Sequence, residues 1–454
     1  MGYVLRASRL FGTNGIRGVV GKTLTVDLAY RVGSSIGVLY PRQRVMVGRD
    51  GRSSSLMLMQ GLIGALLAQG NIVEDCGLIT TPGLQFLVRH SAAAAAVMVT
   101  ASHNPPEYNG FKVIHSDGIE LDPRRQAMVE KLVDRNQWRI NRHPGQKLTR
   151  AHPLEPYFAQ LETLVKNRHV ARSYRIVVDV GNGVAALTTP VLLRRVGCHV
   201  VTLNDNIDGR FSGRLSEPRP ENLSALAALV KSEKADFGVA HDGDGDRAVF
   251  VDETGFVHSG DRSLALIEDE VLKDNRGGKL VTPVNSSMAL SEIAKKRHGK
   301  IVLTRVGSIE VSRTMVREKA ILGGEENGGI FYSPHHPVRD GTMATILVLN
   351  ALTDARVPLS KLMARLPRFF MVKEKIPCLD REKDSAMARL RQKLGRRISN
   401  TVDGVKVDLP GGWLLVRPSG TEPLVRMYVE ASTEEELGAI IAEFRPLVLD
   451  SIKH

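Results

Sequence analysis

One local pattern occurs three times in this chain and narrows the folds that it can adopt. Each copy consists of a short apolar run, a polar turn, a helix-like apolar segment, a glycine and a second apolar run. The first runs are 44–50 (RVMVGRD), 175–180 (RIVVDV) and 279–284 (KLVTPV), and the glycines are Gly70, Gly197 and Gly299. A strand, a capped helix and a second strand form a βαβ unit, whose two strands are parallel. The chain is therefore predicted to contain three related α/β domains with mixed, mostly parallel sheets. The alternative is three generic βαβ units without any relationship.

The last part of the chain follows a different pattern. Strand-like runs lie at 371–378, 405–420 and 421–432, and helix-like segments lie at 385–395 and 434–452. These runs predict a small C-terminal α+β domain. Stretches rich in proline or basic residues mark the expected joints at 142–153, 252–260 and 365–372. The predicted domains are therefore 1–150, 151–253, 254–368 and 369–454.

The composition is that of a globular protein and excludes several classes. A chain of 454 residues is too long for a single core, and 43% hydrophobic with 24% charged residues is ordinary for globular domains. No apolar run reaches membrane-spanning length, and the first fifteen residues lack the apolar core of a signal peptide. Cys76, Cys198 and Cys378 are far apart, which fits neither a disulfide framework nor a zinc site. We expect a cytoplasmic protein, either a monomer or a homodimer.

The net charge of +13 matters because a basic protein can bind nucleic acid, an anionic membrane or anionic small molecules. The lysines and arginines are scattered, and aromatic residues make up only 5% of the chain, so platforms for base stacking are scarce. We therefore expect a basic surface that attracts phosphorylated substrates, with no nucleic-acid partner and no membrane partner. Binding to nucleic acid is the weaker alternative.

The segment TASHNPPEYNGFK at 100–112 follows an apolar run and turns abruptly. Pro105 and Pro106 can continue neither a strand nor a helix interior, so the segment is predicted to be a fixed, exposed loop. This loop presents Ser102 and His103, and Ser102 is the candidate nucleophile. Serine and asparagine are also common turn residues, so ordinary turn chemistry is the alternative.

The segment AHDGDGDR at 240–247 alternates Asp242, Asp244 and Asp246 with glycine. In an extended loop this spacing points three carboxylates to one side, and such hard oxygen ligands suit Mg²⁺ or Ca²⁺. Glu253 stands where an EF-hand has its glutamate, but Arg247 stands at the invariant glycine position and the flanks are strand-like, which excludes an EF-hand. A hairpin with solvated aspartates is disfavoured, because three carboxylates that repel one another need a cation.

Two further loops complete the candidate site. GGEENGG at 323–329 offers Glu325 and Asn327, which can hydrogen-bond hydroxyl groups where glycine lets the backbone approach a ligand. RPSGTEP at 417–423 offers a guanidinium, hydroxyls and backbone N–H groups as a phosphate cradle. Either loop alone is compatible with a simple turn. Together the four loops, one in each predicted domain, supply the parts of a phosphoryl-transfer enzyme, and a cleft between domains is the expected place for a ligand.

These loops resemble, in this order, the TASHNP, DGDGDR, GExSG and RPSGTEP segments of the α-D-phosphohexomutase superfamily. FGTNGIRG at 11–18, GRD at 48–50 and TPG at 81–83 are also similar to family segments, and the resemblance covers essentially the whole chain. The opening segment and the GGEENGG loop are most similar to archaeal members, which are often assigned as phosphoglucosamine mutases. The resemblance implies a heart-shaped arrangement of four domains and an isomerase that converts hexose 6-phosphate into hexose 1-phosphate.

The resemblance also implies roles for individual residues. Ser102 would carry a phosphoryl group and pass it to a hexose monophosphate, and the resulting hexose 1,6-bisphosphate, which is also the activator, would return its other phosphate to Ser102. Ser102 and the three aspartates, Asp242, Asp244 and Asp246, would hold Mg²⁺. The reacting end would be lined by Arg17, His103 and Lys112, with Lys112 or Arg17 handling the proton. The residues that would bind the hexose phosphate are Arg247, Arg305, Glu325, Asn327, Arg417, Ser419, Gly420 and Thr421.

The chain departs from the family pattern in two places. Asn327 and Gly329 stand where many members have a hydroxyl residue and a histidine, and Arg305 stands where the family usually has lysine. The leading hypothesis is a mutase for glucosamine phosphate, and a phosphomannomutase or phosphoglucomutase is the alternative. A hypothesis of another class is an inactive protein that binds sugar phosphates, but the intact Ser102 and aspartates count against it.

Overall fold

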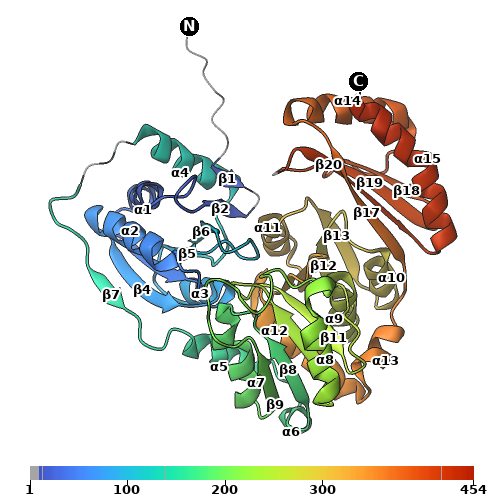
Figure 1. The fold of residues 1–454 in the computed structure, drawn as a ribbon, viewed down its shortest axis with the longest axis horizontal. Coiled ribbons are helices and arrows are strands. Elements are labelled where there is room, and N and C mark those ends of the chain that lie inside the picture. Colours follow the sequence, from blue (N-terminus) through green and yellow to red (C-terminus); the bar gives the residue numbers. More distant parts are fainter. Residues whose placement is uncertain (1–9, 13, 137, 139, 421, 454) are drawn as a thin grey trace. The chain divides into compact units, whose positions relative to one another are not determined.

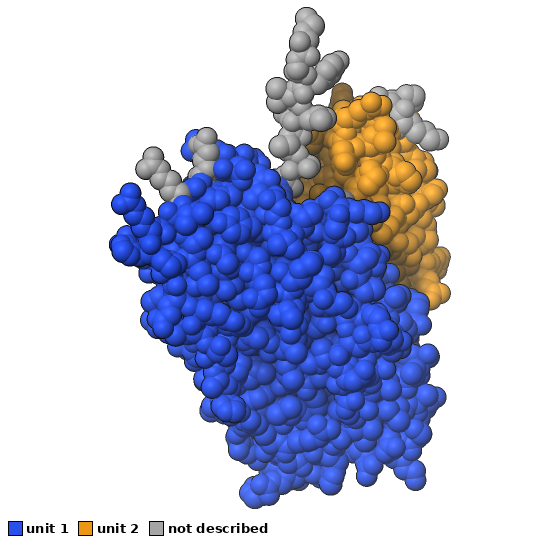
Figure 2. Space-filling model, turned by 60° about the vertical axis from the view of Figure 1, so that its left-hand side comes forward, with its two compact units in different colours: residues 1–259, 328–361 blue, residues 260–327, 362–454 orange. Residues whose placement is uncertain are grey.

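The computed structural model describes residues 10–12, 14–136, 138, 140–420 and 422–453 of the chain (Figure 1). The chain divides into two compact units, which Figure 2 shows in different colours. The first unit comprises residues 1–259 and 328–361, and the second unit comprises residues 260–327 and 362–454. Within the described residues, no helix combines the length and the apolar character that a membrane crossing requires.

The first unit begins with a seven-stranded sheet in the order β1-β2-β6-β5-β3-β4-β7. Its strands are β1 (Phe11–Gly12), β2 (Gly15–Val19), β3 (Arg44–Arg49), β4 (Ile72–Leu78), β5 (Ala95–Val99), β6 (Tyr108–His115) and β7 (Lys147–Thr149). Strands β5, β3, β4 and β7 are parallel, whereas β6, β2 and β1 continue the sheet in antiparallel fashion. The accompanying helices are α1 (Val26–Leu39), α2 (Ser55–Ala68), α3 (Thr81–Arg89) and α4 (Pro123–Arg135).

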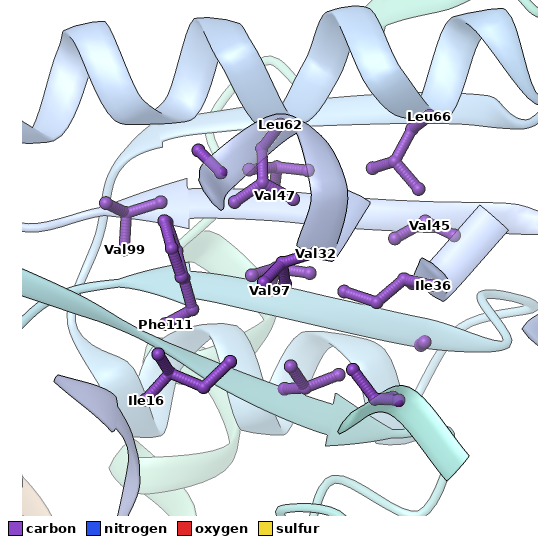
Figure 3. Packing of buried hydrophobic residues seen from close by; sticks show 14 of the residues in the cluster. Ile16, Val32, Ile36, Val45, Val47, Leu62, Leu66, Val97, Val99 and Phe111 are labelled. Atoms are coloured by element: carbon purple, nitrogen blue, oxygen red, sulfur yellow. The ribbon is translucent and has the colours of Figure 1, made fainter. Parts of the chain in front are cut away.

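Alternating side chains divide the core of this sheet between its two faces. The cluster on the face that packs against α1 and α2 includes Val32, Val45, Val47, Leu62 and Val97 (Figure 3). The cluster on the face that packs against α3 includes Met46, Leu84, Leu87, Ala96 and Met98. Neighbouring residues of a strand point to opposite faces, so strands β3 and β5 are apolar on both sides. The loops that follow β3 and β5 therefore start from two strands whose central residues are buried on both faces of the sheet.

The second sheet of the first unit has the order β11-β10-β8-β9. Strand β8 (Arg175–Asp179) is parallel to β9 (His199–Leu203) and to β10 (Phe237–His241), and β10 turns back into the antiparallel β11 (Ala248–Asp252). The helices of this part are α5 (Glu155–Thr163), α6 (Arg168–Ala171), α7 (Thr189–Arg195) and α8 (Ser224–Ser232). The prediction that strands flank the aspartate segment is confirmed, and the aspartates lie at the turn of the β10–β11 hairpin.

The first unit also contains a later part of the chain. Strands β15 (Ile330–Tyr332) and β16 (His336–Arg339) form an antiparallel pair. Helix α12 (Gly341–Ala355) follows, and it contacts both β11 and β15. Asp340 begins this helix by accepting a hydrogen bond from the backbone N–H of Met343, which is ordinary N-cap geometry. The short α13 (Leu359–Ala364) lies where the chain passes into the second unit.

The second unit contains one parallel and one antiparallel set of strands. Strand β12 (Lys279–Pro283) is parallel to β13 (Lys300–Thr304) and to β14 (Leu322–Gly324), with helices α9 (Gly260–Asp274), α10 (Met288–Lys296) and α11 (Ser308–Glu318). The C-terminal sheet has the order β17-β20-β19-β18. Its strands are β17 (Phe370–Pro377), β18 (Val405–Leu409), β19 (Gly412–Pro418) and β20 (Leu424–Ala431), and its helices are α14 (Lys383–Leu394) and α15 (Glu434–Lys453). Short 3₁₀ helices are η1 (Val184–Leu187), η2 (Pro220–Asn222), η3 (Asp380–Glu382) and η4 (Gly395–Arg397).

The predicted fold class is confirmed. The three strand pairs expected from the repeated pattern, β3–β4, β8–β9 and β12–β13, are all parallel. Gly70 and Gly197 stand before the second strands with φ of 84° and 96°, a conformation that glycine adopts without the steric cost of a Cβ atom. The C-terminal part is an antiparallel sheet with two helices, as the α+β prediction required.

Candidate active site

Ser102 lies in the loop between β5 and β6, and its hydroxyl reaches the aspartate hairpin. After the predicted role of Ser102, residues 100–108, which include the first residue of β6, are called the nucleophile loop. The Ser102 Oγ donates a hydrogen bond to Asp242 Oδ2 at 2.8 Å. The backbone of Ser102 is left-handed, with φ of 53°, and its N–H donates to Thr100 Oγ1 at 2.9 Å. A non-glycine residue rarely adopts this conformation without support from its surroundings. The loop was expected to be exposed, but the structure buries Ser102 completely, because the loop packs against the hairpin.

Arg52, which was not among the predicted site residues, supports this loop. Its buried guanidinium donates to four carbonyl oxygens of the loop, those of Ser102 (2.8 Å), Asn104 (2.7 Å), Pro105 (2.7 Å) and Tyr108 (2.9 Å). A planar guanidinium with five N–H donors can satisfy several backbone acceptors at once. Arg52 therefore fixes the backbone that presents Ser102. In the sequence, Arg52 is marked only by its place just after GRD (48–50), which is similar to a family segment. That similarity does not show which groups the Arg52 side chain contacts.

Asp50 also supports the nucleophile loop, through Arg52 and Thr100. It accepts hydrogen bonds from Arg52 Nε (3.1 Å), Ser55 Oγ (2.6 Å) and Thr100 Oγ1 (2.7 Å). Burial raises the pKa of this carboxyl group, while the charge of Arg52 acts against that shift. Because Thr100 also accepts from the Ser102 backbone, the chain Asp50–Thr100–Ser102 joins the end of β3 to the nucleophile loop.

The three aspartates converge in the β10–β11 turn. Asp242, Asp244 and Asp246 are all buried, and one carboxylate oxygen of each lies within 4.8 Å of the other two. A Cβ atom on Gly243 would lie 2.7 Å from the carbonyl oxygen of Ser102. Only glycine therefore allows the turn to approach the nucleophile loop this closely.

One oxygen of each of two aspartates is occupied by a protein donor. Asp244 Oδ2 accepts from Thr81 Oγ1 (2.5 Å) and Lys112 Nζ (2.7 Å). Asp246 Oδ2 accepts from Lys112 Nζ (2.8 Å) and Arg339 (2.6 Å). Neither Thr81 nor Arg339 was among the predicted site residues, and both reach the turn from distant segments. Lys112 was predicted, and the structure places it between two of the aspartates.

The remaining oxygens are suited to a metal ion. Within the part of the chain that the structure describes, Asp244 Oδ1 and Asp246 Oδ1 are buried and have no hydrogen-bond partner. Buried carboxylate oxygens are normally satisfied, so such a pair requires an explanation. A hard divalent cation such as Mg²⁺ prefers carboxylate oxygens, and Ser102 Oγ and Asp242 lie beside the pair. The donor set therefore fits the predicted Mg²⁺ site.

The charges of the surrounding groups are strongly coupled. Burial, and then the neighbouring Asp246 and Asp244, raise the pKa of Asp242 to about 7. Burial would lower the pKa of the Lys112 ammonium, but Asp244 and Asp246 raise it above its ordinary value. Lys112 is therefore a cation at neutral pH. Burial lowers the pKa of Arg17 to about 10, so Arg17 is charged as well.

The other predicted residues of the reacting end also lie here. Arg17 donates to Asn104 Oδ1 at 2.5 Å, and His103 Nδ1 lies 3.4 Å from Ser102 Oγ. The charge of Arg247, followed by burial, holds the pKa of His103 far below its ordinary value, so this imidazole is neutral. Arg247 Nε lies 3.9 Å from Asp242 Oδ2 and 3.8 Å from Asp246 Oδ1. The first unit thus brings together Arg17, Ser102, His103, Lys112, Asp242, Asp244, Asp246 and Arg247.

The remaining predicted residues belong to the second unit. Glu325 is buried and Asn327 is half-buried, both directly after β14. Arg305 Nε donates to the carbonyl of Val402 at 3.1 Å, and Arg417 Nε donates to Asp403 Oδ2 at 2.9 Å. Two arginines that are 112 positions apart in the sequence therefore contact consecutive residues. Asp403 was not predicted, and no local pattern marks it.

The phosphate-cradle segment is held by a lysine. The buried Lys383 donates to the carbonyls of Ser419 and Glu422, each at 2.6 Å, and Ser419 Oγ accepts from the backbone N–H of Glu422 at 3.2 Å. Gly420 is exposed at the tip of this segment. Thr421 lies outside the described residues. Lys383 thus resembles Arg52, because each side chain fixes a loop by donating hydrogen bonds to the carbonyl oxygens of that loop.

Four family models together match most of the chain. They are described as phosphoglucomutase/phosphomannomutase alpha/beta/alpha domain I (residues 8–139), domain II (155–255) and domain III (259–369), and the phosphoglucomutase/phosphomannomutase C-terminal domain (374–447). The four models follow one another along the chain in the order domain I, domain II, domain III and C-terminal domain.

Known proteins resemble the chain over nearly its full length. It is 39% identical to the phosphoglucomutase/phosphomannomutase of Thermococcus kodakarensis over 94% of this chain and 96% of that protein. It is 38% identical to a probable phosphoglucosamine mutase of Methanopyrus kandleri over 97% and 98% of the two chains. A crystal structure of a phosphoglucomutase/phosphomannomutase family protein from Burkholderia thailandensis matches with a TM-score of 0.89 and 29% identity, covering 98% of each chain.

Replacing Arg52 tests the support of the nucleophile loop. The variant Arg52→Met leaves four carbonyls, of which that of Ser102 is buried, without this donor, and it leaves the buried Asp50 without its counter-ion. Removing one partner of a buried ion pair typically costs about 3–5 kcal/mol, and we expect a loss of unfolding free energy in that range. Chemical denaturation followed by circular dichroism measures it. Arg49→Met is the matched control, since Arg49 is half-buried and makes one backbone contact, at 3.2 Å. Equal losses in both variants would contradict the role of Arg52.

Metal binding gives a second prediction. Mg²⁺ at about 100 times its dissociation constant should stabilise the folded protein by about 2.7 kcal/mol, and Asp244→Asn should lose most of this gain. Because the pKa of Asp242 is about 7, a proton occupies this ligand at lower pH. The apparent Mg²⁺ affinity should then fall up to about tenfold per pH unit below 7.

Thermal unfolding with and without Mg²⁺, at pH 6 to 8, measures both effects. The exposed Asp205 supplies the control variant Asp205→Asn, which should respond to Mg²⁺ like the unaltered protein. A melting temperature that is independent of Mg²⁺ at pH 8 would argue against a metal site here.

Proposed function

The chain belongs to the phosphoglucomutase/phosphomannomutase family, and from this premise we propose that it interconverts glucosamine 6-phosphate and glucosamine 1-phosphate through a phosphoserine at Ser102. The chain is a phosphohexomutase, and its family binds sugar phosphates. The choice of sugar and the role of each residue belong to the proposal.

The contact that supports the proposal most is the hydrogen bond of 2.8 Å between Ser102 Oγ and Asp242 Oδ2. It puts a hydroxyl nucleophile beside three carboxylates, two of which have unsatisfied oxygens within the described residues. A dianionic phosphoserine would repel this cluster without a cation. A bound Mg²⁺ would be held by Asp242, Asp244, Asp246 and a phosphate oxygen of Ser102, and would screen their charge.

The cycle requires two transfers at Ser102. In the first, the free hydroxyl of a hexose monophosphate attacks the phosphorus of phosphoserine, the Ser102 Oγ–P bond breaks, and a 1,6-bisphosphate forms. After the bisphosphate turns over, Ser102 Oγ attacks its other phosphate and the P–O bond to the sugar breaks. The phosphoserine is thereby restored, and the product carries its phosphate on the other carbon.

The cations and His103 have different roles in these steps. Lys112 and Arg17 remain charged at neutral pH and, together with the neighbouring guanidinium of Arg247, stabilise the charge of the transferred phosphoryl group. An ammonium cannot accept a proton, which argues against Lys112 as the base. His103 Nδ1 lies 3.4 Å from Ser102 Oγ, and we assign this imidazole to orienting the hydroxyl, because a pKa far below its ordinary value makes it a poor proton acceptor.

In the second unit, Glu325 and Asn327 are assigned to the sugar hydroxyls, and Arg417, Ser419, Gly420 and Thr421 to the phosphate that does not react. Asp403 holds Arg417 through Nε, which orients the guanidinium, and a phosphate can then be bound by the two terminal nitrogens. Arg305 contacts the neighbouring Val402 and is assigned to the same phosphate.

The similarity to phosphoglucosamine mutases favours glucosamine phosphate, and the relative from Thermococcus kodakarensis favours a phosphomannomutase or phosphoglucomutase as the second candidate. Assays of glucosamine, glucose and mannose 1-phosphates side by side, with a hexose bisphosphate as activator, separate the two. We expect the highest kcat/KM for glucosamine 1-phosphate. A higher value for mannose or glucose would establish the second candidate instead.

The phosphoserine predicts the outcome of a small substitution. Ser102→Ala should lose nearly all mutase activity and still fold, because a methyl group fits where the hydroxyl was. Intact-mass analysis should find a phosphorylated fraction in the unaltered protein and in the control Ser53→Ala, whose serine is exposed, and none in Ser102→Ala. Near-normal turnover by Ser102→Ala would exclude this mechanism.

The phosphate cradle must accept either end of the substrate, because phosphate leaves from both carbons of the intermediate. Losing a hydrogen bond to a charged group typically costs about 1.5–3 kcal/mol, or roughly ten- to over a hundredfold in affinity. Arg417→Ala should therefore raise KM for the 1-phosphate and the 6-phosphate by similar factors. Arg445→Ala is the control. The exposed Arg445 lies on α15 and forms an ion pair with Glu374 of β17. A defect in only one reaction direction would restrict Arg417 to one binding pose.

A further inference from the structure

Glu326 stands between the two residues assigned to the sugar, and its own side chain turns to the protein. Its Oε1 accepts a hydrogen bond from Asn285 Nδ2 at 2.8 Å, and its Oε2 forms an ion pair with Lys373. Asn285 follows β12 and Lys373 lies in β17. The side chain of Glu326 is 19% exposed, but that of Lys373 is 49% exposed, so the ion pair is open to water and the hydrogen bond from Asn285 is the better shielded of the two contacts. All three residues belong to the second unit.

The segment that carries Asn285 is itself fixed by buried acids. Asp261, at the start of α9, accepts a hydrogen bond from the backbone N–H of Ser287. Glu430 of β20 accepts from the backbone N–H of Met288 at 2.7 Å and from Trp413 Nε1 at 2.8 Å. The partner of Glu326 is therefore anchored to two other elements of the same unit.

A second link reaches the start of the sugar turn. Thr282 Oγ1 donates to the carbonyl of Gly324 at 3.0 Å and lies 2.5 Å from Ser286 Oγ. The sugar turn is defined here as residues 325–327. Thr282 links Ser286 of the 285–287 turn to the carbonyl of Gly324, which directly precedes the sugar turn, and Asn285 links the same 285–287 turn to the side chain of Glu326.

The charges of this cluster depend on Lys373. Burial would lower the pKa of its ammonium, but Glu326 and Asp261 raise it above its ordinary value. Burial, and then the charge of Glu326, raise the pKa of Asp261 to about 7. One cation therefore compensates two acids, and its loss would leave Glu326 opposed to Asp261 with only the amide of Asn285 as a donor.

We propose that Glu326 is a positioning residue for sugar recognition, which holds the sugar turn in its binding conformation through Asn285 and Lys373. The inference rests on the proposed function, which assigns Glu325 and Asn327 to the sugar. Glycines stand on both sides of the turn, and glycine-rich backbone has much conformational freedom to lose on binding. A turn that is ordered beforehand binds with a smaller entropic cost, so the effect belongs to substrate affinity and not to the transfer at Ser102.

The test compares Glu326→Ala, Lys373→Met and the double variant with the unaltered protein. The readouts are the dissociation constant of glucosamine 6-phosphate by calorimetry, KM and kcat in both directions, and the melting temperature. Each single variant should raise the dissociation constant and KM, by about two- to a hundredfold, with kcat changed less than KM. The double variant should be no worse than Glu326→Ala, because both changes remove the same pair.

Glu318→Gln is the matched control. Glu318 also forms an ion pair with a lysine of this unit, Lys279, at 3.0 Å, but it lies at the end of α11, away from the sugar turn. This variant should leave the dissociation constant and KM unchanged. A fall in melting temperature and kcat with an unchanged dissociation constant in Glu326→Ala would reduce Glu326 to a structural role and overturn the proposal. If the unaltered protein bound no sugar phosphate and had no mutase activity, the proposed function itself would fail, and this inference with it.

Discussion

The main electrostatic constraint on the first unit is a cluster of three buried carboxylates, and one oxygen of each lies within 4.8 Å of an oxygen of the other two. Such a cluster is stable only where cations are brought to it, since burial and mutual repulsion both oppose ionisation. Lys112 and Arg339 supply this charge by direct hydrogen bonds, and Arg247 lies within 4 Å of two of the aspartates. Lys112 comes from β6, Arg339 from β16 and Arg247 from the hairpin itself. The requirement for charge balance therefore ties two distant segments of the chain, β6 and β16, to one turn.

The nucleophile loop is built on a related principle. Ser102 has a left-handed backbone, and a conformation of that kind persists only where the surroundings determine it. Arg52 satisfies four carbonyls of the loop, and Asp50 neutralises Arg52 and fixes Thr100. The position of the Ser102 hydroxyl is consequently fixed by polar contacts of residues outside the predicted site.

The second unit repeats this arrangement around the residues that are predicted to bind the sugar phosphate. Asp403 orients Arg417 of β19, Lys383 holds the segment of Ser419, and Asn285 with Lys373 holds Glu326. The segments of Ser419 and Glu326 are rich in glycine or serine, and each is held by a charged or amide side chain. Flexible loops let the backbone approach a ligand, and the supporting residues remove the conformational freedom that such loops would otherwise lose on binding.

The sequence by itself determined the fold class and the chemical core of the site. The parallel strand pairs were predictable because apolar runs, polar turns and helix-ending glycines are local features of the sequence, and the aspartates were predictable because they lie in one short hairpin. Only the tertiary structure identified Arg52, Thr81, Arg339, Asp403 and Lys383, and only it showed that Ser102 is buried. Apart from the local pairs Arg52–Asp50 and Lys383–Asp380, the contacts described for these side chains join residues that are between 14 and 163 positions apart. No local pattern encodes which backbone carbonyl or carboxylate will lie near a given arginine or lysine. That choice is made by the packing of complete sheets and helices, because hydrogen bonds depend on distances in space and not on spacing along the chain.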